Sequence, residues 1–196
     1  MSTSPPCYFL VLYGSYRAAR AGIRFANYMV YNLSARGHTV ELIDAKAVGL
    51  PMLDKRYFEY APGTAPEAMV TLADKLSAAD GYVFVAGEYN WGMQPGLKNL
   101  VDHYGKEFVR RPAGIVTYSA GRLAGARSNS MWHPTLTELG MAVIPSTITV
   151  GTISTALDED AQPIGEGGAA LDRSFPAFAE ELEWWAAAVR AARGKA

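Results

Sequence analysis

Five short runs of mostly apolar residues, separated by segments with helical spacing, constrain the fold of this sequence more than any other feature. The runs cover residues 8–13, 39–43, 81–86, 113–118 and 141–150. Continuous apolar runs of this length are typical of strands that are buried on both faces of a sheet. Strands that alternate with helices pair in parallel, because each connection crosses back over the sheet. The sequence therefore predicts a single α/β domain over residues 1–196, with helices on both faces of a five-stranded parallel sheet.

The ends of the helices are marked with different clarity. Gly37 is well placed to stop the first helix, and residues 64–67 (TAPE) resemble a capping box ahead of another. We expect Ser174 to cap the last helix, after an acidic and glycine-rich loop at residues 158–168. Residues 44–63 look irregular, and so long a connection is uncommon in a compact domain unless it has a function.

Composition excludes several classes of function. The formal net charge is −1, which implies no bulk attraction to nucleic acid or to anionic lipid. No apolar run approaches the roughly 20 residues of a membrane-spanning helix. Cys7 is the single cysteine, and the N-terminus has no basic residues ahead of its apolar run, unlike a signal peptide. We therefore expect a cytoplasmic protein that binds neither membrane nor nucleic acid.

Several candidate sites are weak. The histidines at positions 38, 103 and 133 lack metal-binding spacing, so no metal site is expected. Ser119 lacks the GxSxG setting of a hydrolase nucleophile. Asp44 ends the second run, where dinucleotide-binding folds place a ribose-binding acid; because GxGxxG is absent, we expect Asp44 to cap a helix or a loop.

Ligands of parallel α/β sheets bind beyond the carboxyl ends of the strands. The loop after the first strand reads GSYRAARAG and covers residues 14–22; we call it the first loop. Ser15, Arg17 and Arg20 precede a helix N-terminus, whose free N–H groups and dipole favour an anion. The loop is neither a P-loop nor GxGxxG, and its two guanidinium groups suit a terminal phosphate monoester. The alternative is that both arginines simply solvate the start of a helix.

The loop after the third strand, GEYNWGMQPGLKN at residues 87–99, is the second loop. Its glycines permit backbone conformations that other residues resist, and Pro95 suits the first turn of a helix. Such a loop could present backbone groups, with Tyr89 and Trp91, to a flat heteroaromatic ring. Taken alone, it could equally be a turn that leads into a helix.

Together with SAGRLAGAR at residues 119–127, the third loop, these motifs resemble the NADPH-dependent FMN reductase family of flavodoxin-like proteins. That family includes quinone, azo and chromate reductases, and the resemblance runs from about residue 7 to residue 151. It implies that the first loop holds the FMN phosphate, the second lies along the isoalloxazine ring, and the third lies at the other side of the flavin. The implied cofactor-binding residues are Gly14, Ser15, Arg17, Arg20, Gly22, Glu88, Tyr89, Asn90, Trp91, Ser119, Gly121, Arg122 and Gly125.

Two positions depart from the family's motifs. Gly87 stands where the family usually has proline before Glu-Tyr-Asn, which puts the stiffness of the second loop in question. Ala124-Gly125 replaces a double glycine, so the backbone of the third loop is expected to approach the flavin less closely.

The resemblance implies an oxidoreductase that transfers a hydride from NAD(P)H to bound FMN and then reduces an acceptor such as a quinone, an azo compound, a metal oxyanion or free flavin. The flavin would carry the chemistry, with no catalytic side chain. Two alternatives are a flavodoxin-type electron carrier and a non-catalytic regulatory domain on the same fold. The family is commonly dimeric or tetrameric, so we expect a homodimer or homotetramer in which residues 57–60 and His103-Tyr104 border the nicotinamide and acceptor pocket, from a neighbouring subunit.

Overall fold

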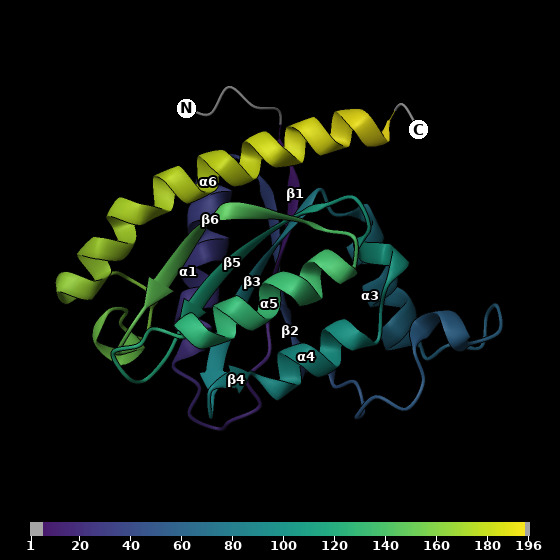
Figure 1. Ribbon diagram of the computed structural model, residues 1–196, viewed down its shortest axis with the longest axis horizontal. Helices are drawn as coiled ribbons and strands as arrows, with labels where there is room; N and C mark the ends of the chain where they lie inside the picture. The colour runs from purple at the N-terminus through teal and green to yellow at the C-terminus, as the bar shows by residue number, and fades with distance from the viewer. Residues whose placement is uncertain (1–5, 195–196) are drawn as a thin grey trace.

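The computed structural model describes residues 6–194 and shows one twisted sheet between two layers of helices (Figure 1). Five strands pair in parallel in the order β2-β1-β3-β5-β6. They are β1 (Tyr8–Tyr13), β2 (Thr39–Asp44), β3 (Gly81–Tyr89), β5 (Pro112–Tyr118) and β6 (Ala142–Val150). The predicted parallel sheet with helices on both faces is therefore confirmed. The predicted total of five strands is wrong, because the sheet has six. A sixth strand, β4 (Gly92–Met93), pairs antiparallel with the end of β3.

The helices divide between the two faces of the sheet. Helices α1 (Gly22–Ala35) and α6 (Gly165–Arg193) cover one face, and α3 (Glu67–Ala78), α4 (Pro95–Asp102) and α5 (Ala126–Glu138) cover the other. Short helical segments complete the chain: α2 (Ala45–Val48), η1 (Tyr57–Glu59), η2 (Lys106–Phe108) and η3 (Ile153–Thr155). None of the helices in the described part of the chain has the length and apolarity that crossing a membrane requires.

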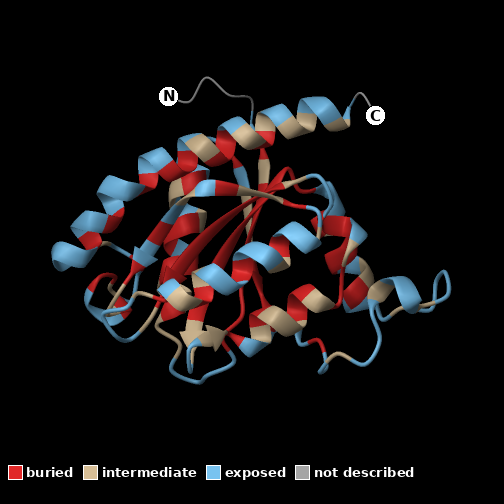
Figure 2. Ribbon diagram, in the orientation of Figure 1, coloured by how far each residue is buried: buried red, intermediate tan, exposed pale blue. Residues whose placement is uncertain are grey.

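The strands are buried on both faces, as their apolar runs predict. In β1, Phe9 and Val11 belong to the core under α1 and α6, whereas Leu10 and Leu12 belong to the core on the opposite face. Figure 2 shows the consequence: the central strands are buried along their length, and exposed residues gather on the outer sides of the helices.

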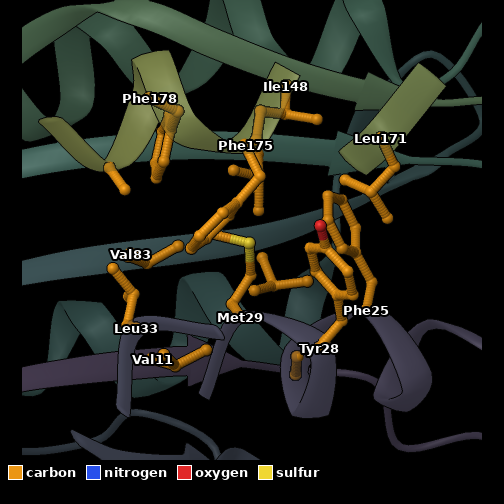
Figure 3. Packing of buried hydrophobic residues seen from close by; sticks show 14 of the residues in the cluster. Val11, Phe25, Tyr28, Met29, Leu33, Val83, Ile148, Leu171, Phe175 and Phe178 are labelled. Atoms are coloured by element: carbon orange, nitrogen blue, oxygen red, sulfur yellow. The ribbon is translucent and has the colours of Figure 1, made fainter. Parts of the chain in front are cut away.

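The α1–α6 face is closed by large side chains that meet over the sheet (Figure 3). Met29 of α1 and Phe175 and Phe178 of α6 lie over the strands that carry Val11 and Val83. Gly114 of β5 is part of this fit, because a Cβ there would lie 2.4 Å from Cζ of Phe178. The close approach of Phe178 to the strand backbone sets the position of α6 over β5.

Two predictions of helix ends are wrong and one is right. Gly37 follows α1 with φ +97° and ends it. Helix α3 begins at Glu67 without a side-chain cap, and the Thr64 hydroxyl donates instead to the Ala61 carbonyl. Ser174 lies inside α6 and donates to the Ala170 carbonyl, because α6 begins at residue 165, within the stretch expected to be a loop.

Tertiary packing explains the early start of α6. A Cβ on Gly168 would lie 2.6 Å from the Ala156 carbonyl oxygen and 2.7 Å from the Pro163 carbonyl carbon. The glycines at the start of this helix therefore allow its first turn to pack tightly on the segment after β6. Glycine usually disfavours a helix interior, and here close packing overrides that preference.

The connection between β2 and α3 contains two short helical segments and exposed apolar side chains. Met52 and Phe58 are 79% and 58% exposed. Tyr57 packs against Tyr104 with ring centroids 5.9 Å apart, and its N–H donates to the His103 carbonyl at 2.8 Å. The two aromatic segments singled out in the sequence therefore lie side by side.

Strand order reverses between β1 and β3, because β2 lies on one side of β1 while β3, β5 and β6 follow on the other. In open α/β sheets this is the position where ligands bind, outside the carboxyl ends of the strands. The first, second and third loops follow β1, β3 and β5 and therefore converge at this edge.

Candidate functional site

A cavity of about 380 Å³ lies beyond the carboxyl edge of the sheet. Its volume falls within the range of small-molecule sites. All three loops contribute to it. The lining residues are Ser15, Arg17, Ala19, Arg20, Ala21, Gly22, Gly87, Glu88, Tyr89, Asn90, Tyr118, Ser119, Ala120 and Ile153.

The first loop lines the cavity and contains backbone donors without backbone partners. No backbone oxygen in the described part of the chain accepts a hydrogen bond from the N–H groups of residues 17–22. Helix α1 begins at Gly22 without a side-chain cap and without an acidic residue in its first turn. Free donors at a helix N-terminus, reinforced by the helix dipole, favour an anion such as a phosphate group.

The path of the first loop depends on glycines that meet across it. A Cβ on Gly14 would lie 2.1 Å from the backbone nitrogen of Leu97. A Cβ on Gly96 would lie 2.3 Å from the Gly14 carbonyl oxygen. The end of β1 therefore rests directly on the first turn of α4, which explains why both loops carry glycine there. The Ser15 and Tyr89 hydroxyls share a hydrogen bond of 3.1 Å, which also links the first loop to the second.

The two arginines of the first loop differ in their surroundings. Arg17 is exposed and lines the cavity. Arg20 forms a two-point ion pair with Asp44, with Nη1–Oδ1 and Nη2–Oδ2 distances of 2.7 Å each. The hydrogen bond to Asp44 raises the pKa of Arg20. Asp44 also accepts the Lys46 N–H at 3.1 Å at the start of α2, so the prediction that it caps a helix is confirmed.

The second loop forms a β-hairpin that its sequence does not reveal. Strands β3 and β4 pair Glu88 with Met93 and Tyr89 with Gly92. The two turn residues, Asn90 and Trp91, have φ values of +47° and +74°. Two-residue hairpin turns of this kind normally contain glycine, and a bulky residue in this conformation is strained. The Asn-Trp pair hides the hairpin from sequence analysis because tryptophan is not a turn-forming residue.

An ion pair and an aromatic contact fix the hairpin. The Glu88 carboxylate accepts the Arg127 N–H at 3.1 Å and its Nη1 at 2.9 Å. The Arg127 guanidinium carbon lies 3.6 Å from the centroid of the Trp91 ring, within the range of cation–π contacts. Glu88 therefore links the hairpin to the first turn of α5, and the Trp91 ring packs over the Arg127 guanidinium that makes this link.

Tyr118, which lines the cavity, forms a buried polar pair with Gln94, which lies outside the lining. Gln94 is 1% exposed and donates from Nε2 to the Tyr118 hydroxyl at 3.0 Å. Burial raises the pKa of Tyr118, so its phenol stays neutral. A Cβ on Gly22 would lie 2.0 Å from Cζ of Tyr118, and one on Gly87 would lie 2.8 Å from Nε2 of Gln94. The departure from proline at position 87 thus accompanies close packing by Gln94 and Tyr118.

The third loop contributes less to the cavity than expected. Ser119 and Ala120 line it, and the Ser119 hydroxyl donates to the Gly121 carbonyl at 2.7 Å. Ala124 has φ +54°, and its carbonyl accepts the Thr117 hydroxyl at 2.7 Å. A Cβ on Gly125 would lie 2.9 Å from Cβ of Thr117, so the second glycine of the family motif is kept where space requires it.

Most of the predicted site residues meet at one cavity. Of the residues predicted to bind the cofactor, those that line the cavity are Ser15, Arg17, Arg20, Gly22, Glu88, Tyr89, Asn90 and Ser119. The predicted residues outside its lining are Gly14, Trp91, Gly121, Arg122 and Gly125. Tyr118 and Ile153 line the cavity and were missed. Tyr118 could have been found as the last residue of a strand at this edge, whereas Ile153 carries no local signal.

The sequence is similar to those of known FMN reductases. Residues 8–155 match the model of a family described as NADPH-dependent FMN reductase. An NAD(P)H-dependent FMN reductase of Saccharomyces cerevisiae is 28% identical over 172 residues, which cover 78% of this chain and 86% of that protein. An NAD(P)H-dependent FMN reductase of Pseudomonas aeruginosa is 34% identical over 104 residues, which cover 51% of this chain and about half, 54%, of that protein.

Solved structures support the fold. The flavoenzyme NAD(P)H:(acceptor) oxidoreductase FerB of Paracoccus denitrificans superposes with a TM-score of 0.70 at 20% identity, over 90% of this chain and 97% of that one. A flavodoxin variant of Pseudomonas aeruginosa superposes with a TM-score of 0.55 at 15% identity, over 89% of this chain and 98% of that one. The expected flavodoxin-like architecture is therefore confirmed.

The residues of the cavity fit FMN. N–H groups without backbone acceptors at the start of α1 and the exposed Arg17 suit a phosphate. The end of β3 supplies Gly87, Glu88 and Tyr89 to the lining, which suits a flat ring. With the family model matching 148 of the 196 residues, from 8 to 155, the chain belongs to the NADPH-dependent FMN reductase family.

Proposed function

We propose that this protein is an NAD(P)H-dependent FMN oxidoreductase that reduces a small-molecule acceptor such as a quinone, an azo compound, a metal oxyanion or free flavin. One observation carries the proposal: the first loop, whose N–H groups at residues 17–22 have no backbone acceptor in the described part of the chain, lines a cavity at the point where strand order reverses. When bound there, FMN supplies the hydride and electron transfer, so the protein needs no acid, base or nucleophile of its own.

The residues of the chain bind and orient the cofactor and exclude water. Arg17 and the N–H groups of the first loop would hold the phosphate. Glu88, Tyr89 and Asn90 would lie along the ring, on a hairpin whose backbone conformation is fixed by β3–β4 pairing. Tyr118 lines the cavity as a neutral phenol, so it adds no charge to the lining.

The range of acceptors is supported by the names of similar proteins. They include a quinone reductase of Escherichia coli, 36% identical over 66 residues that cover 32% of this chain and 35% of that protein. They also include an NADPH azoreductase of a Bacillus strain, 28% identical over 102 residues that cover 50% of this chain and 57% of that protein.

We also propose a cytoplasmic location. Its support is the single cysteine, which allows no disulfide within the chain and suits a reducing compartment.

The test begins with the flavin. Purified protein is examined by absorbance, and the flavin released by heat is identified by mass. Turnover of NADH and of NADPH is then measured against a quinone, an azo dye, chromate and free FMN. The proposal expects bound FMN and nucleotide-dependent reduction of at least one acceptor. FMN without nucleotide oxidation would indicate a flavodoxin-type carrier, and protein that stays colourless after FMN is added would indicate a non-catalytic domain.

We also propose a homodimer or homotetramer in which the aromatic segment around Tyr57 and Tyr104 borders a neighbouring subunit's acceptor pocket. Its support is the exposure of Phe58, 58%, beside the paired rings of Tyr57 and Tyr104. Light scattering of wild-type protein and of Phe58→Ser tests this assembly. We expect the variant to weaken assembly and raise the acceptor KM while FMN binding is retained; a monomeric wild type would contradict the proposal.

A further inference from the structure

We propose that Arg20 positions the first loop and is not a ligand of the phosphate, so that Arg17 is the arginine of this loop that meets the phosphate charge. The inference rests on the proposed function, because it concerns how the cavity binds FMN. Two arginines in one short loop suggest a pair of phosphate ligands, and the structure instead gives them different partners.

The guanidinium of Arg20 is held from several directions. Both of its terminal nitrogens lie 2.7 Å from the Asp44 carboxylate oxygens. Nη1 also donates to the Ser15 carbonyl at 3.3 Å, and the guanidinium carbon lies 5.7 Å from the centroid of the Tyr13 ring. A two-point arginine–carboxylate pair is among the strongest and most directional contacts that a side chain makes. Arg20 therefore joins the first loop to the end of β2.

Asp44 is itself fixed in place. Its side chain is 11% exposed, lies at the end of β2 and accepts the Lys46 N–H at the start of α2. A second link reaches the same corner, because the Tyr16 hydroxyl donates to the Ala45 carbonyl at 2.8 Å. The first loop is thus tied to the β2–α2 corner at two points, and the Arg20–Asp44 pair is one of them.

Charge explains why the pair would persist when a phosphate binds. If Arg20 turned toward a phosphate, it would leave the mostly buried Asp44 carboxylate without its cation. That carboxylate would then repel the incoming anion. With the pair intact, Arg20 and Asp44 contribute no net charge, and the phosphate meets Arg17 together with the N–H groups of residues 17–22.

The test compares a variant that removes one positive charge with a variant that removes a positive and a negative charge together. FMN affinity is measured by titration of flavin-free protein at low and high salt in wild type, in Arg17→Gln and in the double variant Arg20→Gln/Asp44→Asn. We expect Arg17→Gln to weaken FMN binding about tenfold to hundredfold, the range for a hydrogen bond to a charged group, and to flatten its salt dependence. We expect the double variant to weaken FMN binding less than Arg17→Gln does, because the first loop loses one of its two ties, and to keep the full salt dependence, because it removes no net charge.

A third variant separates the two roles if the double variant fails to fold. Asp44→Asn alone leaves Arg20 in place without its carboxylate partner. If Arg20 positions the loop, this variant binds FMN no more tightly than wild type. If Arg20 is a phosphate ligand restrained by Asp44, this variant binds FMN more tightly and with a steeper salt dependence, which would overturn the inference.

Two further outcomes are distinguishable. A double variant that loses salt dependence as Arg17→Gln does, while wild type binds FMN, would overturn this inference and leave the proposed function standing. Wild-type protein that binds no FMN would overturn the proposed function and the inference together. Circular dichroism of each variant confirms that the fold is intact before the titration.

Discussion

The first loop and the hairpin of the second loop both line one cavity, and each is anchored by an arginine–carboxylate pair. The two pairs differ in which partner belongs to the loop. In the first loop the arginine belongs to the loop, and Arg20 reaches out to Asp44. In the hairpin the acid belongs to the loop, and Glu88 reaches out to Arg127. Both pairs neutralise charge near the cavity.

The backbones of the two loops are used in different ways. The first loop leaves the N–H groups of residues 17–22 without backbone acceptors in the described part of the chain. The hairpin pairs its own strands and confines its strain to the turn at Asn90 and Trp91. The first loop therefore offers donors to an anion, and the hairpin offers a rigid surface. Under the proposed function, the first loop would bind the charged phosphate and the hairpin would support the flat ring.

The largest effect on stability is expected from Gly14→Ala, which disrupts the packing of the end of β1 against the first turn of α4. The new Cβ would lie 2.1 Å from the backbone nitrogen of Leu97, and neither backbone can move aside cheaply. We expect a loss of about 3 kcal/mol in the free energy of unfolding, the upper end for overpacking, measured by urea denaturation. The control is Gly121→Ala, where a Cβ meets nothing within 4 Å. Equal stability of the two variants would contradict the packing described here.

Glu88→Ala tests the anchor of the hairpin. It removes both acceptors of Arg127, one of which holds a backbone N–H at 3.1 Å. Because hydrogen bonds to charged groups are the stronger ones, we expect a loss of about 2 kcal/mol in the free energy of unfolding. Glu88→Gln retains one acceptor and should lose about half as much. If Glu88→Ala lost less free energy of unfolding than Glu88→Gln, the Glu88–Arg127 pair would not be what holds the hairpin.

Tyr118→Phe tests the buried hydrogen bond between Gln94 and the Tyr118 hydroxyl. It leaves the buried Nε2 of Gln94 without its hydroxyl acceptor, so we expect a loss of about 1–2 kcal/mol at pH 7. The control is Tyr31→Phe, where the ring is 65% exposed and the change should have little effect.

The difference in stability between wild type and Tyr118→Phe is expected to depend on pH. Burial raises the pKa of Tyr118, so the folded state keeps a proton that the unfolded state releases above about pH 10. The contribution of Tyr118 to stability is therefore full below about pH 10 and is lost as the pH rises further. Urea denaturation between neutral and alkaline pH should show the gap between wild type and Tyr118→Phe narrowing above pH 10. A gap that is constant with pH would contradict the assignment.

The smallest effect is expected from Trp91→Gly. Glycine relieves the strain of φ +74°, worth about 1–2 kcal/mol, and loses a cation–π contact worth about 0.5–1 kcal/mol at an exposed site. The two changes nearly cancel, so the free energy of unfolding should rise by about 1 kcal/mol or less. Trp91→Ala keeps the strain and loses the contact, and it should be less stable than Trp91→Gly. The reverse order would show that the turn is not strained.

Local patterns in the sequence determined the order and type of the main elements and the identity of the three loops. Apolar runs such as residues 8–13 identify buried strands, and Ser15, Arg17 and Arg20 ahead of a helix led to the prediction of an anion-binding loop, because these signals depend only on neighbouring residues. The composition of the second loop indicated a site but not a hairpin, since its turn contains tryptophan where glycine is usual.

Only the tertiary structure decided which partners these residues have. Arg20 meets Asp44 from 24 residues away, and Glu88 meets Arg127 from 39 residues away. The start of α6 likewise depends on how Gly168 packs against Ala156. Such contacts are set by strand order and by the distances between packed backbones, and local periodicity contains neither. The sequence therefore predicts two arginines in an anion-binding loop, and only the fold shows that one of them, Arg20, is paired with Asp44 at the end of β2.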